Sequence, residues 1–376
     1  MNAYFDGAVN QLLERGQCLL LMIPTGLPRE FHLLEQTCRD RLTNTLDELQ
    51  QLITEKIWRI TENQPERLRQ FKRLVRDLDL LETVCIAALE RANHTDLHLN
   101  RLVERIRQEI AYPLLPPVVT PLSQAYFQTW PDFHLMLVPL SEGNFLLHLP
   151  DLYHELAHPL FHERYNQRVA PFLDAFHEVI EAVTVYTETE LEKEQGGAES
   201  EYLELWLICW LKGWAEEFFC DLFAVYTLGP AFAWSHLHLS ATRGDDPYKV
   251  PLGMRVTTHP PDGARMAVIL EGLMFMGFHP EAAQIENQWK QLAKTVQSQP
   301  EVEYHRCFPA HLLKLLAEKA LAGVAGMKCR LAKPETRNDV HDVFNQAWTE
   351  FWRDPGTYVQ WEKQAVQHLR EKCLIP

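Results

Sequence analysis

Apolar residues recur every three or four positions along most of this chain, which is the spacing typical of amphipathic helices. Residues 37–63 show it, with Leu42, Leu49 and Ile57 among their apolar positions, and Pro65 is expected to break that helix. Residues 66–93 and 96–110 repeat the pattern. The chain is therefore predicted to begin with a region of helices.

Residues 133–149 carry a different pattern. The apolar stretches "HLMLVPL" and "NFLLHL" flank the polar stretch "SEGN", which predicts two short strands around a turn. The second of these strands, Asn144–Leu149, is expected either to pair within the core or to receive an extended peptide as an added strand. Helical spacing returns in residues 169–193 and 201–228 and continues, interrupted by prolines, to the C-terminus.

These patterns predict a mostly α (α+β) fold with a small β-hairpin or sheet. The proline-rich stretch "PLLPPVVTP", residues 113–121, cannot be helical throughout and is predicted to separate two regions. The predicted division is a helical N-terminal region at 1–112, a core at 113–275, and a helical C-terminal region at 276–376 that packs on the core.

The charge distribution narrows the range of partners. The net charge is −15, and residues 113–260 contribute −13 of it, with 7 basic and 20 acidic residues. Nucleic acid is therefore not expected as a partner, because phosphate binding needs clustered basic charge. An acidic region favours cations or basic peptides, or it is simply a solvated face.

Cysteine spacing and hydropathy bear on the compartment. The eight cysteines include no C-x-x-C pair, so they are expected to be reduced thiols of a cytoplasmic protein. No apolar stretch has the roughly 20 residues that a membrane-spanning helix needs. The sequence therefore predicts no integral membrane segment.

One short motif carries candidate chemistry. His154, Glu155 and His158 have the spacing H-E-x-x-H directly after a proline. Residues four apart lie on one face of a helix, so the two imidazoles can bind one metal ion, and Glu155 can reach a water on it. The alternative is a helix with two surface histidines. Pro159 lacks a backbone donor, so the helix is expected to kink or end there.

A catalytic zinc needs a third protein ligand. His162 lies a further turn along, too far to reach the same ion, and is expected at the surface or behind the ligands. The better candidate is Glu217 in "WAEEFFCDLFA", with Asp221 one turn later. Acidic residues on an apolar helix are unfavourable unless they are paired or bind metal. Asp221 is expected to accept a hydrogen bond from a ligand histidine. The alternative is an exposed acidic stripe.

H-E-x-x-H followed by E-x-x-x-D resembles the gluzincin zinc peptidases. The later stretch "THPPDGARM" is similar to the third motif of the HtpX-like and CAAX-prenyl-protease-type metallopeptidases, and the three motifs occur in that family's order. The resemblance covers about residues 133–275. It implies Zn²⁺ bound by His154, His158 and Glu217, and Glu155 as general base. It further implies Asp221 behind the ligands, with His259 and Arg265 near the site. That family is typically embedded in the membrane, whereas no such segment is expected here.

The predicted function is therefore a zinc metallopeptidase, expected to be an endopeptidase, acting on a peptide or protein substrate. Glu155 would take a proton from a zinc-activated water and pass it to the leaving amine. The principal alternative is a non-catalytic helical interaction or scaffold protein with a structural or vestigial zinc site. A carboxylate-bridged di-iron bundle needs Glu-x-x-His from two helices, and only the pair Glu155 and His158 has that spacing.

Overall fold

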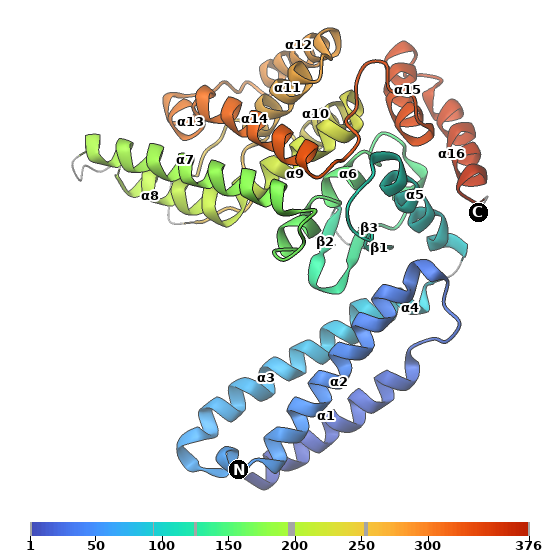
Figure 1. Cartoon of the computed structure of the whole chain (residues 1–376), viewed down its shortest axis with the longest axis vertical. Coiled ribbons are helices and arrows are strands. Elements are labelled where there is room, and N and C mark those ends of the chain that lie inside the picture. The colour runs from blue at the N-terminus through green and yellow to red at the C-terminus, as the bar shows by residue number, and fades with distance from the viewer. Residues whose placement is uncertain (1, 93, 124–125, 195–199, 252–254, 375–376) are drawn as a thin grey trace. The chain divides into compact units, whose positions relative to one another are not determined.

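The computed structural model describes residues 2–92, 94–123, 126–194, 200–251 and 255–374 (Figure 1). The described chain is mostly helical with one small three-stranded sheet, which confirms the predicted mostly α class. It divides into two compact units. Residues 1–101 and 117–140 form the first unit, and residues 102–116 and 141–376 form the second. The predicted three-part division stays a prediction.

The first unit contains long helices that pack along one another (Figure 1). They are α1 (Asn2–Met22), α2 (His32–Thr54) and α3 (Gln64–Leu80), followed by a π-helical turn and the short α4 (Ala87–Glu90). Helix α2 shows why they pack. Its buried positions fall three or four residues apart and form one apolar stripe: Leu34, Cys38, Leu42, Thr45, Leu49 and Leu52.

The expected end of the second helix is wrong. Helix α2 ends at Thr54 because Glu55 is extended, and two short 3-10 turns follow before α3. Pro65 lies in the first turn of α3 instead of breaking a helix. Proline is tolerated there because the first backbone N–H groups of a helix have no partner within it.

The sheet also belongs to the first unit. Its strands are β1 (Val118–Ser123), β2 (Gln128–Trp130) and β3 (Leu135–Pro139), in the order β1-β3-β2, with β1 parallel and β2 antiparallel to β3. Strand β3 falls within the predicted "HLMLVPL" strand. The second predicted strand is wrong: Asn144–Leu149 forms the end of a 3-10 turn and further turns, so it offers no strand edge to a peptide.

The second unit is built from helices. It contains the second half of α5 (His94–Ile110), within which the boundary between the units lies. The others are α6 (Asp151–Glu155), α7 (Ala170–Glu194), α8 (Ser200–Cys209), α9 (Ala215–Leu228), α10 (Pro230–Arg243), α11 (Asp262–Phe275), α12 (His279–Thr295), α13 (Val302–Cys307), α14 (Ala310–Gly326), α15 (Asp339–Arg353) and α16 (Tyr358–Leu374).

Helix α9 lies at the centre of this unit. It packs against α6, α7, α10, α11 and α14, and every residue of it except Glu216 is buried. It continues from α8 through the π-helical turn Trp210–Trp214. The carboxylates of Glu217 and Asp221 are therefore held inside the unit, where they need partners.

Among the described helices, none has both the length and the apolar character needed to cross a lipid bilayer. The seven cysteines whose side chains are described are free thiols.

Candidate metal centre

The H-E-x-x-H segment begins as a helix and is interrupted inside the motif. Helix α6 ends at Glu155, and a 3-10 turn begins at His158 with Pro159 next to it, which confirms the predicted interruption. The two histidines still lie together, with ring centroids 5.1 Å apart. His154 and Glu155 are both buried. The break in the helix therefore does not separate the two imidazoles.

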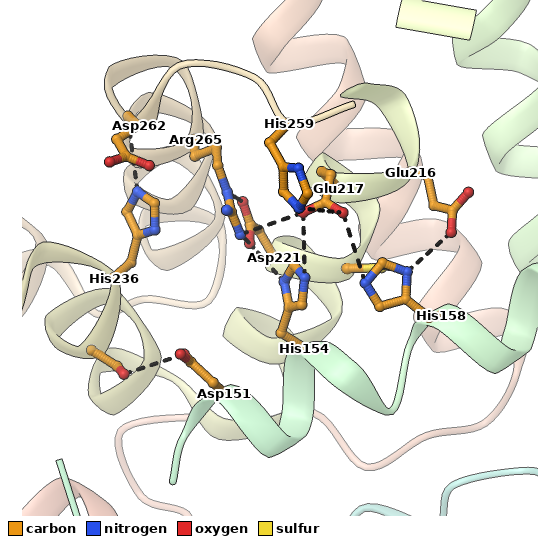
Figure 2. A network of polar contacts seen from close by, with 12 residues as sticks. Asp151, His154, His158, Glu216, Glu217, Asp221, His236, His259, Asp262 and Arg265 are labelled. Carbon is orange, nitrogen blue, oxygen red and sulfur yellow. Dashed lines mark hydrogen bonds and ion pairs between the residues drawn. The ribbon is translucent and has the colours of Figure 1, made fainter. Parts of the chain in front are cut away.

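Glu217 of α9 meets both histidines from the opposite side (Figure 2). One of its carboxylate oxygens lies 3.5 Å from His154 Nε2, and the other lies 3.8 Å from His158 Nε2. Glu217 is only 7% exposed. The structure thus brings together the three side chains that the sequence analysis predicted as metal ligands.

The Nδ1 atom of His154 is held by Asp221, one turn along α9. The Nδ1 to Oδ1 distance is 2.8 Å, and Asp221 is fully buried. Arg265 of α11 donates to both oxygens of Asp221, at 2.8 and 2.5 Å. This bidentate contact fixes the carboxylate of Asp221. The carboxylate in turn fixes the ring of His154 so that its Nε2 faces Glu217.

The charges in this group depend on one another. Burial alone would lower the pKa of His154, but Asp221 and Glu217 outweigh burial and raise it to about 10 in the metal-free protein. Burial would raise the pKa of Glu217, but His154 and Arg265 lower it to about 2. The pKa of Asp221 also lies well below its usual range, because Arg265 outweighs its burial. Without a metal, a proton on His154 is held between two carboxylates.

The spacing of these atoms suits a metal ion. Ligands bound about 2.0–2.2 Å from a tetrahedral zinc lie about 3.3–3.5 Å apart. The two Nε2-to-carboxylate distances, 3.5 and 3.8 Å, are close to that value. Two neutral imidazole nitrogens with one carboxylate are also a ligand set that zinc accepts in hydrolases. The residues present therefore fit such an ion.

A second set of possible ligands overlaps the first. His154, His158 and Cys220 each offer one ligand atom, and these atoms lie within 4.8 Å of one another, so this group could hold a metal ion. Burial and nearby carboxylates raise the pKa of the Cys220 thiol well above its ordinary value. The thiol would have to lose its proton to bind an ion, whereas the lowered pKa of Glu217 keeps its carboxylate ionised.

The remaining predicted residues lie around the same point. His259 Nε2 is 3.6 Å from a Glu217 oxygen, and its side chain is 63% exposed. Glu155 is buried. Burial would lower the pKa of His158, but the hydrogen bond with Glu216 and, to a smaller extent, the charge of Glu155 raise it above its ordinary value. His162 is exposed, in keeping with the surface position expected for it.

Two residues at this centre were not predicted. Glu216 Oε1 lies 3.0 Å from His158 Nδ1 (Figure 2). Cys220 Sγ lies 3.6 Å from the same nitrogen. The sequence contained one usable indication. Glu216 and Cys220 are four residues apart, as Glu217 and Asp221 are, so the members of each pair lie along one face of α9.

Comparison of the chain with protein-family models, with curated proteins and with solved structures gives no match. The resemblance to gluzincin peptidases therefore remains a prediction from the three motifs. What the structure adds is the spatial convergence of their side chains.

Proposed function

We propose that this protein is a zinc-dependent metallopeptidase. The observation that carries the proposal is the convergence of His154 Nε2, His158 Nε2 and the Glu217 carboxylate, with Asp221 and Arg265 behind them. The H-E-x-x-H and E-x-x-x-D motifs that supply these side chains resemble those of gluzincins. We infer a zincin-like core made by α6, α9 and the residues 257–265.

Each residue of the centre would have its own role in peptide hydrolysis. A zinc ion held by His154, His158 and Glu217 would supply a Lewis acid and an activated water. Glu155 would take a proton from the attacking water and pass it to the leaving amine. The exposed imidazole of His259 would donate a hydrogen bond to the carbonyl oxygen under attack. Arg265 and Asp221 would keep His154 in its ligand orientation.

The proposal includes a peptide or protein substrate and a cytoplasmic location. The free thiols support that location, because disulfides are rare in reducing compartments. The acidic balance of residues 113–260 favours substrates that carry basic residues.

The test uses the full-length protein, its zinc content and the cleavage of casein. The wild type is expected to bind one equivalent of zinc and to cleave casein. Glu155→Gln should keep the zinc and lose at least about 100-fold of the rate, since general base catalysis contributes about 10²–10⁴-fold. Glu163→Gln is the matched control and should stay active, because Glu163 is the nearest glutamate in the sequence that lies outside the motif.

Each result has a definite meaning. Cleavage that persists in purified Glu155→Gln contradicts the role of Glu155. One equivalent of zinc with no cleavage of casein or of a mixed peptide library favours the alternative, a scaffold with a structural zinc site. A wild type that binds no zinc contradicts both.

A further inference from the structure

Helix α9 presents two parallel pairs of side chains, one pair to each histidine. Glu217 and Asp221, four residues apart, contact the two nitrogens of His154. Glu216 and Cys220, also four residues apart, both contact Nδ1 of His158. The two pairs are alike in spacing, but the second pair contains a carboxylate and a thiol that compete for one nitrogen.

Hydrogen bonding at one imidazole nitrogen decides which nitrogen can bind a metal. A neutral imidazole carries one N–H, and a carboxylate at 3.0 Å is a much stronger acceptor for it than a thiol at 3.6 Å. With its N–H directed to Glu216, His158 has its lone pair on Nε2, the nitrogen that faces Glu217. Asp221 does the same for His154.

Loss of Glu216 would remove this constraint. The N–H of His158 could then move to Nε2, which leaves the lone pair on Nδ1, the nitrogen that already lies 3.6 Å from Cys220 Sγ and could share an ion with it. The ligand atoms of His154, His158 and Cys220 already lie within 4.8 Å of one another. The structure thus contains a second ligand set that needs only a small local change.

We propose that Glu216 is a positioning residue that selects between these two ligand sets. With Glu216 present, His158 binds the metal through Nε2 alongside His154 and Glu217, and Cys220 stays outside. Without it, the metal is held less tightly and Cys220 becomes a ligand. This inference rests on the metal centre of the proposed function.

Cobalt(II) gives a direct test, because a cysteine ligand produces a sulfur-to-cobalt charge-transfer band in the near ultraviolet. Full-length wild type loaded with Co²⁺ is expected to lack this band. Glu216→Ala should gain it, and the double variant Glu216→Ala/Cys220→Ala should lose it again. Zinc affinity, measured by competition with a coloured chelator, should fall about 10–100-fold in Glu216→Ala.

Further variants separate the possible causes. Glu216→Gln keeps the shape of the side chain without its charge and should lose less zinc affinity than Glu216→Ala. Cys220→Ala alone should bind zinc as the wild type does. Glu204→Ala removes an exposed glutamate from α8 and should change neither readout. Circular dichroism identifies any variant that does not fold. If Glu216→Ala does not fold, the zinc affinity of the isosteric Glu216→Gln decides: a loss relative to the wild type supports the role of Glu216, and an unchanged affinity contradicts it.

The failures of this inference and of the proposed function are distinguishable. A wild type that binds neither zinc nor cobalt overturns both. Metal that is lost in Glu217→Ala but held equally by Glu216→Ala, without the charge-transfer band, overturns the role of Glu216 alone. A charge-transfer band in the wild type that disappears in Cys220→Ala shows that Cys220 is already a ligand. This result overturns the proposal that Glu216 selects between the two ligand sets.

Discussion

At the scale of single residues, Gly213 supports the segment that carries His259. It lies in the π-helical turn before α9, where a Cβ atom would overlap the carbonyl oxygen of Thr258 and lie 2.8 Å from its Cα. The neighbouring Trp214 donates from Nε1 to Thr257 Oγ1 at 3.2 Å. Residues 257–258 thus pack against the turn that leads into α9, the helix that carries Glu217. This packing helps to place His259 beside that carboxylate.

Gly213→Ala is therefore expected to be harmful. The new methyl group meets main-chain atoms, which cannot turn aside as a side chain can, so the free energy of unfolding should fall by about 1–3 kcal/mol. Urea denaturation measures this. Gly7→Ala is the matched control, because nothing lies within 4 Å of a Cβ at this helical position, and it should raise stability by up to about 1 kcal/mol. Equal stability of Gly213→Ala and wild type would contradict the argument.

Much of the centre was predictable because helical spacing is a local property. His154 and His158, and likewise Glu217 and Asp221, lie four apart, which alone indicates a shared face. That the two pairs meet is a long-range contact, and only the resemblance in motif order indicated it. Glu216 was missed because one acidic residue beside another is usually a solvated surface position.

At the scale of elements, Glu109 of α5 caps the N-terminus of α15. Its carboxylate accepts hydrogen bonds from the backbone N–H groups of Val340, at 3.0 Å, and His341, at 3.4 Å. The first N–H groups of a helix have no partner within it, so a carboxylate there is favourable. Burial nevertheless raises the pKa of Glu109 above its ordinary value, and the two backbone hydrogen bonds only partly oppose that effect.

This cap predicts a pH dependence of stability. Because the folded protein holds the Glu109 proton more tightly than the unfolded chain does, the free energy of unfolding falls as pH rises from the ordinary glutamate pKa to the raised one. Glu109→Gln should lack that fall. Urea unfolding from about pH 4 to about pH 7 should therefore show the stability of the wild type decreasing relative to Glu109→Gln. Glu318→Gln, at an exposed position on α14, should run parallel to the wild type. A constant difference between wild type and Glu109→Gln would contradict the prediction.

Elements were predictable where periodicity was long and unbroken. The helical stretches that contain α2, α3 and α5 were found, but α1 was not singled out. The end of α2 was not found either, since the apolar Ile57 and Ile60 prolong the helical pattern but are half exposed in the structure. The apolar run in residues 144–149 is too short to distinguish a strand from buried turns. Strand β1 was missed because it lies among prolines, and its pairing with β3 is irregular after Thr120.

At the scale of the whole molecule, a bound metal should stabilise the second unit. A ligand that binds only the folded state stabilises it by mass action, by about 2.7 kcal/mol at 100 times its dissociation constant. Zinc should therefore raise the melting temperature of this unit in calorimetry. Glu217→Ala, which lacks the proposed third ligand, should show a much smaller rise. Equal rises in both proteins would show that zinc acts elsewhere.

The division into two units depends on contacts between segments that are distant in the sequence. The sheet, residues 118–139, belongs with the N-terminal helices in this division. Contacts between distant segments cause this. The Asn100 side chain exchanges two hydrogen bonds of 2.8 Å with the backbone of Val119, and the Arg41 guanidinium lies 4.2 Å from the centre of the Phe133 ring.

These contacts predict how a truncation at the proline-rich stretch would behave. A chain of residues 113–376 keeps the strands but loses Asn100 and Arg41, so the sheet loses its partners and exposes strand edges. It also loses Glu109, the cap of α15 in the other unit. We expect this chain to aggregate in size-exclusion chromatography and to unfold without a cooperative transition in urea, whereas the full chain behaves as a folded protein. A monodisperse truncated chain that binds zinc as the full chain does would show that these contacts are dispensable for the metal centre.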